Sequence, residues 1–204
     1  MASWDRETNT AEEEQIEKYG GFYVGRYEAG IGTNRTSIEE QVDGKYPVPT
    51  TVPVTKADAY PYTYVTRTQA VSLAEGFATK QGYKAKTKLV SSYAWDTTIA
   101  FIQKVNSDYG SSSGEENYYN KTFSYTDITG ASQTKSSNSP VLVPTGQTTP
   151  VCNIYDMGGN VLEWTTESCS YKFSPYAMRG GDGSGKFAHD AAGYRINNPG
   201  DAYG

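Results

Sequence analysis

The stretch "IYDMGGNVLEWTTE" (residues 154–167) gathers groups that could do chemistry on a short loop. Two glycines, an asparagine, a glutamate and a tryptophan fall within seven positions, so the backbone can turn sharply beside oxygen-bearing side chains. Such a set suits a catalytic loop, a metal-binding loop or a purely structural turn. The choice among them depends on the rest of the chain.

The other residues with catalytic chemistry are few. Cys152 and Cys169 are too few for a disulfide-stapled scaffold, and two buried or idle thiols are the simplest interpretation. His189 is the only histidine and stands in a polar segment, where a surface residue is commoner than a ligand. Every Ser/His/Asp catalytic triad would need this one histidine, so the sequence gives no recognisable triad.

Composition narrows the function classes. The 204 residues fit one domain, and a net charge of -5 with mixed signs and no basic block argues against nucleic-acid binding and membrane attachment. The first 21 residues have no apolar core, so they predict neither a signal peptide nor a membrane anchor. The 18 tyrosines and 21 glycines are typical of an antibody-like recognition surface. A loop-rich protein whose tyrosines cap its core has the same composition.

Two helices are predicted to position these residues. Thr66 and Gln69 form a capping box at the start of the first helix, and Gly82 is a natural residue to end it. Its apolar face comprises Ala70, Leu73, Ala74, Phe77 and Ala78. The second helix begins after Ser91 or Ser92. Its expected core residues, at helical spacing, are Trp95, Ile99, Ile102 and Val105.

The remainder predicts short strands and long loops. Alternating aromatic and small residues in "GGFYVGRYEAG" (20–30) predict a strand. Residues 31–64 and 106–150 show no period and read as insertion-type loops, and glycines divide the chain after Cys152 into short segments. We therefore expect an α+β domain over residues 20–204, with residues 1–19 as an N-terminal extension.

Several of these pieces, in this order, resemble one family. The strand at 20–30, "KLVSSYAWDTT" (88–98), "NIYDMGGNVLEWTTE" (153–167), "MRGGDGSG" (178–185) and "YRINNPGDAYG" (194–204) are similar to segments of the formylglycine-generating enzyme (sulfatase-modifying factor) superfamily. The resemblance covers most of the chain, and the "GGNVLEW" piece is the most specific. It implies a C-type lectin-like fold with two helices, short strands and long irregular loops.

The resemblance also gives the opening loop a role. In the family this segment packs its tryptophan into the core and helps to bind calcium, which prefers hard oxygen ligands. Trp164 would then be a core residue, and the calcium ligands would come from Gly158, Asn160, Val161 and Glu163. The alternative is that Asn160 and Glu163 hydrogen-bond the loop's own backbone with no metal. Either role is structural.

Catalysis in the family's manner is not expected. Formylglycine-generating enzymes use two cysteines soon after the "RGG" segment, and the matching positions here, near Gly185 and Asp190, are not cysteines. The related iron enzymes need several histidines. We expect no enzyme activity and no required cofactor beyond a structural calcium. An oxidoreductase relative with unfamiliar chemistry is the alternative from another class.

Among the relatives, the chain is most similar to the variable proteins of diversity-generating retroelements. These display a diversified C-terminal segment between fixed framework residues, and residues 170–203 show that interleaving around anchors at Met178–Gly181 and Arg195. The resemblance implies a receptor-binding domain within a larger phage-tail or bacterial or archaeal surface protein. Its partner would be a protein or glycan on a target cell. A non-diversified phage or bacterial adhesion module of the same fold is the alternative.

The predicted binding surface is a set of aromatic and polar residues that lack a helical or strand period. We expect one contiguous exposed face, because such segments pack poorly inside a protein and make rigid contacts outside it. If its aromatic residues are instead ordinary core, no such face exists. The set comprises Tyr171, Phe173, Tyr176, Asp182, Ser184, Lys186, Phe187, His189, Asp190, Tyr194, Asn197, Asn198, Asp201 and Tyr203.

Overall fold

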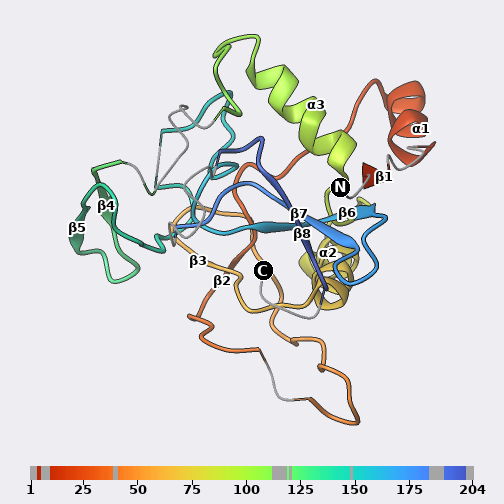
Figure 1. Cartoon of the computed structure of the whole chain (residues 1–204), viewed down its shortest axis with the longest axis horizontal. Helices are drawn as coiled ribbons and strands as arrows, with labels where there is room; N and C mark the ends of the chain where they lie inside the picture. The colour runs from red at the N-terminus through yellow and green to blue at the C-terminus, as the bar shows by residue number, and fades with distance from the viewer. Residues whose placement is uncertain are drawn as a thin grey trace.

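The chain is an α+β protein with a four-stranded antiparallel sheet near its centre (Figure 1). The computed structural model describes residues 4–5, 10–38, 41–111, 119, 121–147, 149–183 and 191–200. The helices there are α1 (Thr10–Tyr19), α2 (Arg67–Gln81) and α3 (Ser92–Ile102). The strands are β1 (Trp4–Asp5), β2 (Gly30–Ile31), β3 (Tyr60–Pro61), β4 (Phe123–Thr126), β5 (Ser132–Lys135), β6 (Glu163–Cys169), β7 (Tyr176–Arg179) and β8 (Arg195–Asn198). No helix in these ranges is long and apolar enough to cross a membrane.

The two predicted helices begin and end where their caps require. Thr66 Oγ1 accepts from the Gln69 backbone N–H at 3.2 Å, and the Gln69 side chain accepts from the Thr66 N–H at 3.0 Å, which completes the predicted capping box of α2. Gly82 ends α2 with a φ of 75°, a conformation that favours glycine. The Ser91 hydroxyl caps α3 by accepting from the Ala94 N–H at 3.1 Å.

The central sheet has the strand order β1-β6-β7-β8, and its strands are antiparallel. Across β6 and β7, Trp164 pairs with Met178 and Glu163 with Arg179. Arg179 pairs in turn with Arg195 on β8. Successive side chains of a strand point to opposite faces, so Met178 and Arg179 serve different sides of the sheet.

Each side of the sheet has its own hydrophobic cluster. On the α2 side, Trp164 and Met178 pack with Leu73 and neighbouring residues; on the α3 side, Trp95 and Ile99 belong to the cluster that includes Met157 and Ala192. In the view of Figure 1, α3 lies above the sheet and α2 below it. Both indole N–H groups are satisfied, by Val65 O at 2.9 Å for Trp164 and by Ala192 O at 2.7 Å for Trp95.

Four sequence predictions need correction. The strand expected at 20–30 is irregular up to Ala29, and only Gly30 enters β2. Helix α1 was not predicted, and residues 1–19, expected to be an extension, supply β1 to the central sheet. Val105 lies beyond the end of α3 and is 76% exposed, so it is not a core residue. The two long loops contain short β-structure. The first, 31–64, begins in β2 and contains β3, which pairs with β2, and the second, 106–150, contains the β4–β5 hairpin.

Candidate functional site

The C-terminal segment alternates between buried anchors and exposed side chains. Met178 and Arg179 are 1% and 2% exposed, and the glycines that follow them are buried, as predicted for the Met178–Gly181 anchor. Arg195, the other predicted anchor, lies opposite Arg179 and is half-buried. Among the described residues between the anchors and before them, 171–177, 182–183 and 191–194, the side chains that reach solvent are mostly polar or aromatic. The sheet therefore fixes the backbone while these side chains remain available.

Gly180 shows why this anchor needs its glycines. Its φ of 76° favours glycine, and a Cβ there would strike the Glu163 carboxylate and Met157 O. Because of this close approach, the "RGG" segment packs directly against the loop at residues 158–163, which we call the Gly-Asn loop. Two of the five pieces that resemble the family are thus neighbours in the fold.

Five of the predicted binding residues lie at one end of the β6–β7–β8 sheet. Tyr171 and Phe173, on the turn between β6 and β7, are 47% and 73% exposed, and their rings meet edge to face with centroids 6.0 Å apart. Tyr176 is half-buried, and the guanidinium carbon of Arg67, the first residue of α2, lies 4.3 Å from its ring centroid. Asn197 and Asn198 are half-buried on β8, where Asn198 lies opposite Tyr176.

Asp182 and Tyr194 lie at the other end of the same strands. Asp182 comes shortly after the last residue of β7, and Tyr194 precedes the first residue of β8; both are half-buried. Strands of four residues separate the two groups by about 10 Å. The other predicted binding residues, Ser184, Lys186, Phe187, His189, Asp190, Asp201 and Tyr203, lie outside the described residues.

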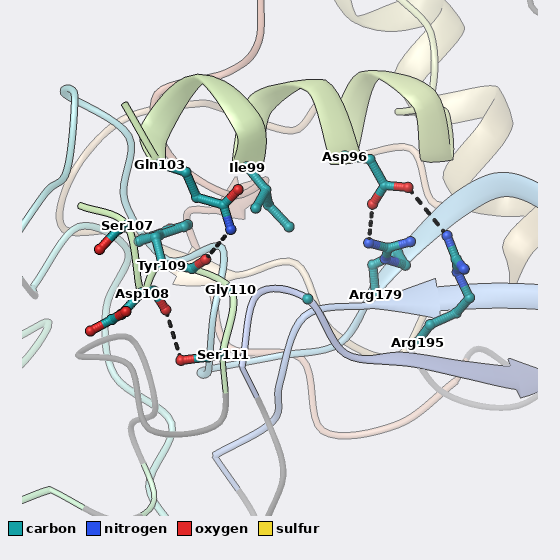
Figure 2. Close-up of a pocket in the computed structure, with 11 residues that line it drawn as sticks. Asp96, Ile99, Gln103, Ser107, Asp108, Tyr109, Gly110, Ser111, Arg179 and Arg195 are labelled. Carbon is teal, nitrogen blue, oxygen red and sulfur yellow. Dashed lines mark hydrogen bonds and ion pairs between the residues drawn. The ribbon is translucent and has the colours of Figure 1, made fainter. Parts of the chain in front are cut away.

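A cleft of 480 Å³ lies beside this second group (Figure 2). Its walls come from α3, from the segment that follows α3, and from the β7–β8 hairpin. The lining residues are Asp96, Ile99, Gln103, Ser107, Asp108, Tyr109, Gly110, Ser111, Arg179, Gly193 and Arg195. Sequence reasoning identified Arg179 and Arg195 as anchors but did not identify this cleft.

Four charged side chains form a network at one end of the cleft, which we call the mixed cluster: Asp96, Glu167, Arg179 and Arg195. Arg179 donates to one oxygen of Asp96, and Arg195 Nη2 lies 3.4 Å from the other, as Figure 2 shows. Arg195 Nε lies 2.9 Å from Glu167 Oε2, which also accepts from the Ser92 hydroxyl. The two positive and two negative charges balance.

Asn160 holds the Gly-Asn loop in place through backbone contacts with another segment. Its Oδ1 accepts from the Val143 N–H at 2.9 Å, and its Nδ2 donates to Val143 O at 3.0 Å and to the Glu28 carboxylate. Asn160 is 1% exposed and has a φ of 65°, a conformation that asparagine tolerates. The Asn160 side chain is therefore engaged with Val143 and Glu28 and not, as the alternative predicted, with the backbone of its own loop.

Three carboxylates meet behind this loop, and we call them the acid cluster: Glu28, Asp156 and Glu163. Burial, reinforced by the charge of Asp156, raises the pKa of Glu28 well above its ordinary value, although the bond from Asn160 opposes the shift. Burial, then the charges of Glu28 and Asp156, raises the pKa of Glu163 well above its ordinary value. The Oε2 atoms of Glu28 and Glu163 are buried without a hydrogen-bond partner.

The acid cluster has the donor chemistry of a cation site but not its geometry. Hard carboxylate oxygens suit calcium, and two of them here lack partners. Of the predicted ligand residues, only Glu163 presents such an oxygen; Gly158 is buried, and Val161 is half-buried. Within the described ranges, no three His, Cys, Asp or Glu side chains converge closely enough to hold a metal ion.

The cysteines offer no second site. Cys152 and Cys169 are both free, and Cys169 is 5% exposed within β6. The Cys169 thiol lies 3.3 Å from Ser174 O, in the turn that carries the exposed aromatic pair. A buried thiol of this kind packs as a small apolar side chain.

Comparison with known proteins gives the chain no relatives. No family model matches it, and no curated protein or solved structure is significantly similar to it.

Proposed function

We propose that this chain is a non-catalytic binding domain of the C-type lectin-like, formylglycine-generating-enzyme type. In this proposal the C-terminal segment presents its exposed side chains to a protein or glycan receptor on a target cell. The chain would be a retroelement-diversified variable protein, carried on a phage tail or a cell surface. A structural calcium is part of the proposal, and no catalytic cofactor is.

The observation that supports this most is the exposed aromatic pair on a rigid turn. Tyr171 and Phe173 follow the end of a strand in which Trp164 and Thr165 are buried. Large exposed rings on a fixed backbone lose little conformational entropy on binding, so they make efficient contacts. An exposed aromatic pair on a sheet turn has no evident role in holding the fold together.

A display library tests the separation between framework and surface. One library randomises a surface set of five positions, and a matched library randomises five buried positions of the same sheet. The surface set is Tyr171, Phe173, Asp182, Tyr194 and Asn197. The framework set is Trp164, Thr165, Ala177, Met178 and Arg179. The measurement is the fraction of clones that resist protease on the display surface.

We expect most surface-set clones and few framework-set clones to resist protease. Proteolysis follows the population of unfolded chains, so it reports stability directly. Equal losses in the two libraries would remove the basis for a diversifiable surface. A template repeat and a reverse-transcriptase gene beside this gene would favour the retroelement protein over a fixed adhesion module.

The calcium proposal places the ion at the Gly-Asn loop, where the buried Oε2 atom of Glu163 lacks a hydrogen-bond partner. Glu163 would hold the ion together with backbone oxygens of Gly158, Asn160 and Val161, and the ion would supply the positive charge that the neighbouring carboxylates lack. Calorimetric titration of the chelator-treated chain with calcium tests this directly. Copper or iron bound stoichiometrically through Cys152 and Cys169 would instead favour an oxidoreductase relative.

A further inference from the structure

The 480 Å³ cleft has the size of a small-molecule site, about 300–1,000 Å³, and it adjoins one end of the proposed surface. Gly193 and Arg195 line it, so Tyr194 stands between two lining residues. The inference below names the ligand class of this part of the surface and therefore rests on the proposed function.

The described residues that line the cleft offer almost no apolar anchor. Its two largest apolar side chains, Ile99 and Tyr109, are only 8% and 4% exposed. Gln103, Ser107 and Asp108 are exposed and polar. Peptide and lipid ligands depend on buried apolar or aromatic anchors, so this lining suits neither class.

The charges of the cleft also disfavour an ionic ligand. Arg179 and Arg195 are balanced by Asp96 and Glu167 at one end, and Asp108 adds a single exposed negative charge at the other. Among the described lining residues, an added anion would meet no surplus positive charge. An added cation would meet, among these residues, the exposed carboxylate of Asp108, which interacts weakly in water.

The cleft nevertheless offers polar side chains that a ligand can reach. At its charged end the side chains of Asp96 and Arg195 are 55% and 28% exposed, whereas that of Arg179 is 3% exposed. Gln103 Nε2 donates to Tyr109 O at 2.8 Å, and this bond, drawn in Figure 2, leaves the Gln103 amide oxygen available as an acceptor.

We infer that this cleft binds a neutral sugar unit of a glycan. Sugar hydroxyls both donate and accept hydrogen bonds, and they carry no charge, which matches a balanced lining of guanidinium, carboxylate, amide and hydroxyl groups. The carboxylate of Asp96 and the guanidinium of Arg195 would bind hydroxyls on one side of the ring. Gln103 and Asp108 would bind hydroxyls on the other.

The test uses the intact chain and an array of neutral oligosaccharides, together with carboxylated and sulfated forms of the same oligosaccharides. We expect binding to neutral members that changes less than about twofold when the salt concentration is raised, because no net charge is neutralised. The double variant Gln103→Ala/Asp108→Asn should lose about tenfold or more in affinity, the loss expected when buried polar groups of a ligand lose their partners. Both residues are exposed, so its melting temperature should fall by no more than the loss of the single bond from Gln103 to Tyr109 O allows.

Lys104→Ala is the matched control, because Lys104 is exposed just after α3 and does not line the cleft. It should leave glycan binding unchanged. Binding to none of the neutral glycans, preference for the charged forms, or full binding by the double variant would each overturn the assignment. The paired display libraries judge the wider proposal separately: surface-set tolerance with no glycan binding would reject the cleft alone.

Discussion

The acid cluster and the mixed cluster are neighbours in the sheet, yet they hold buried charge in different ways. Glu163 of the acid cluster lies opposite Arg179 of the mixed cluster in the register of the two strands, so the two clusters meet across β6 and β7. The acid cluster contains three carboxylates and no cation. The mixed cluster contains two carboxylates and two guanidiniums. One cluster is therefore balanced in charge, and the other is not.

The difference shows two ways in which this fold accommodates buried charge. In the mixed cluster, opposite charges stabilise one another, and removing one partner leaves the others uncompensated. In the acid cluster, burial and mutual repulsion favour the protonated form, which the raised pKa values of Glu28 and Glu163 express. Substitutions in the mixed cluster should therefore destabilise the fold. Neutralising a carboxylate of the acid cluster should leave the stability unchanged or raise it.

The largest effect is expected from breaking the mixed cluster. Arg179→Ala should lower the free energy of unfolding by about 2–5 kcal/mol, because it empties the space of a buried side chain and leaves Glu167 with Arg195 as its remaining guanidinium neighbour. Urea denaturation of the variant and the parent measures the difference. Lys172→Ala, at an exposed position of the turn between β6 and β7, is the control. A loss below about 1 kcal/mol, the size of a surface pair, would mean that the mixed cluster contributes little.

Neutralising the acid cluster should act in the opposite direction. In chelator at neutral pH, Glu163→Gln should raise the free energy of unfolding by about 1–3 kcal/mol, because it removes a buried carboxylate oxygen without a partner. Glu75→Gln, at an exposed position of α2, is the control. If calcium stabilises the parent but not Glu163→Gln, the ion binds at this cluster. A destabilised Glu163→Gln in chelator would contradict the comparison.

The acid cluster should also make stability depend on pH. A carboxyl whose pKa is raised in the folded state binds more protons there than in the unfolded chain, so stability falls as pH rises above the ordinary value of 4.5. Each such carboxyl contributes a slope of up to about 1.4 kcal/mol per pH unit. Thermal melts of the calcium-free parent should show this decline, and Glu163→Gln should flatten it. Identical profiles would remove the acid cluster as its source.

The smallest effect is expected at the outer edge of the mixed cluster. Asp96→Asn should change stability by about 1 kcal/mol or less, because the side chain is 55% exposed and water screens its ion pairs. Thermal denaturation at low and high salt measures it, and the difference should shrink as salt increases. A loss comparable to that of Arg179→Ala would show that the bond from Arg179 to Asp96 contributes far more than the exposure of Asp96 implies.

Local signals predicted the helices well. The Thr66–Gln69 capping box and the Ser91 cap act between residues three positions apart, so sequence alone contains both partners. Trp95 and Trp164 are 5% and 4% exposed, as expected of core residues. Helix α1 escaped prediction because its side chains from Glu13 onward are all exposed, which leaves no apolar face to detect.

The site was predicted less well, because its contacts join distant parts of the chain. Asp96 and Arg179 are 83 positions apart, and Glu28 meets Asn160 across 132 positions. No spacing rule connects such residues. The strand expected at 20–30 failed for a related reason: alternation predicts a strand only where a neighbour pairs with it, and Tyr23 is fully exposed.

The indole contacts of Trp95 and Trp164 give the two sides of the sheet separate optical signals. Each ring is buried in a different hydrophobic cluster and donates to a carbonyl from a distant segment. In a Trp4→Phe background, replacing one of them by Phe leaves the fluorescence of the other to report on its own side. Loss of packing near α3 could then be followed in time independently of loss of packing near α2.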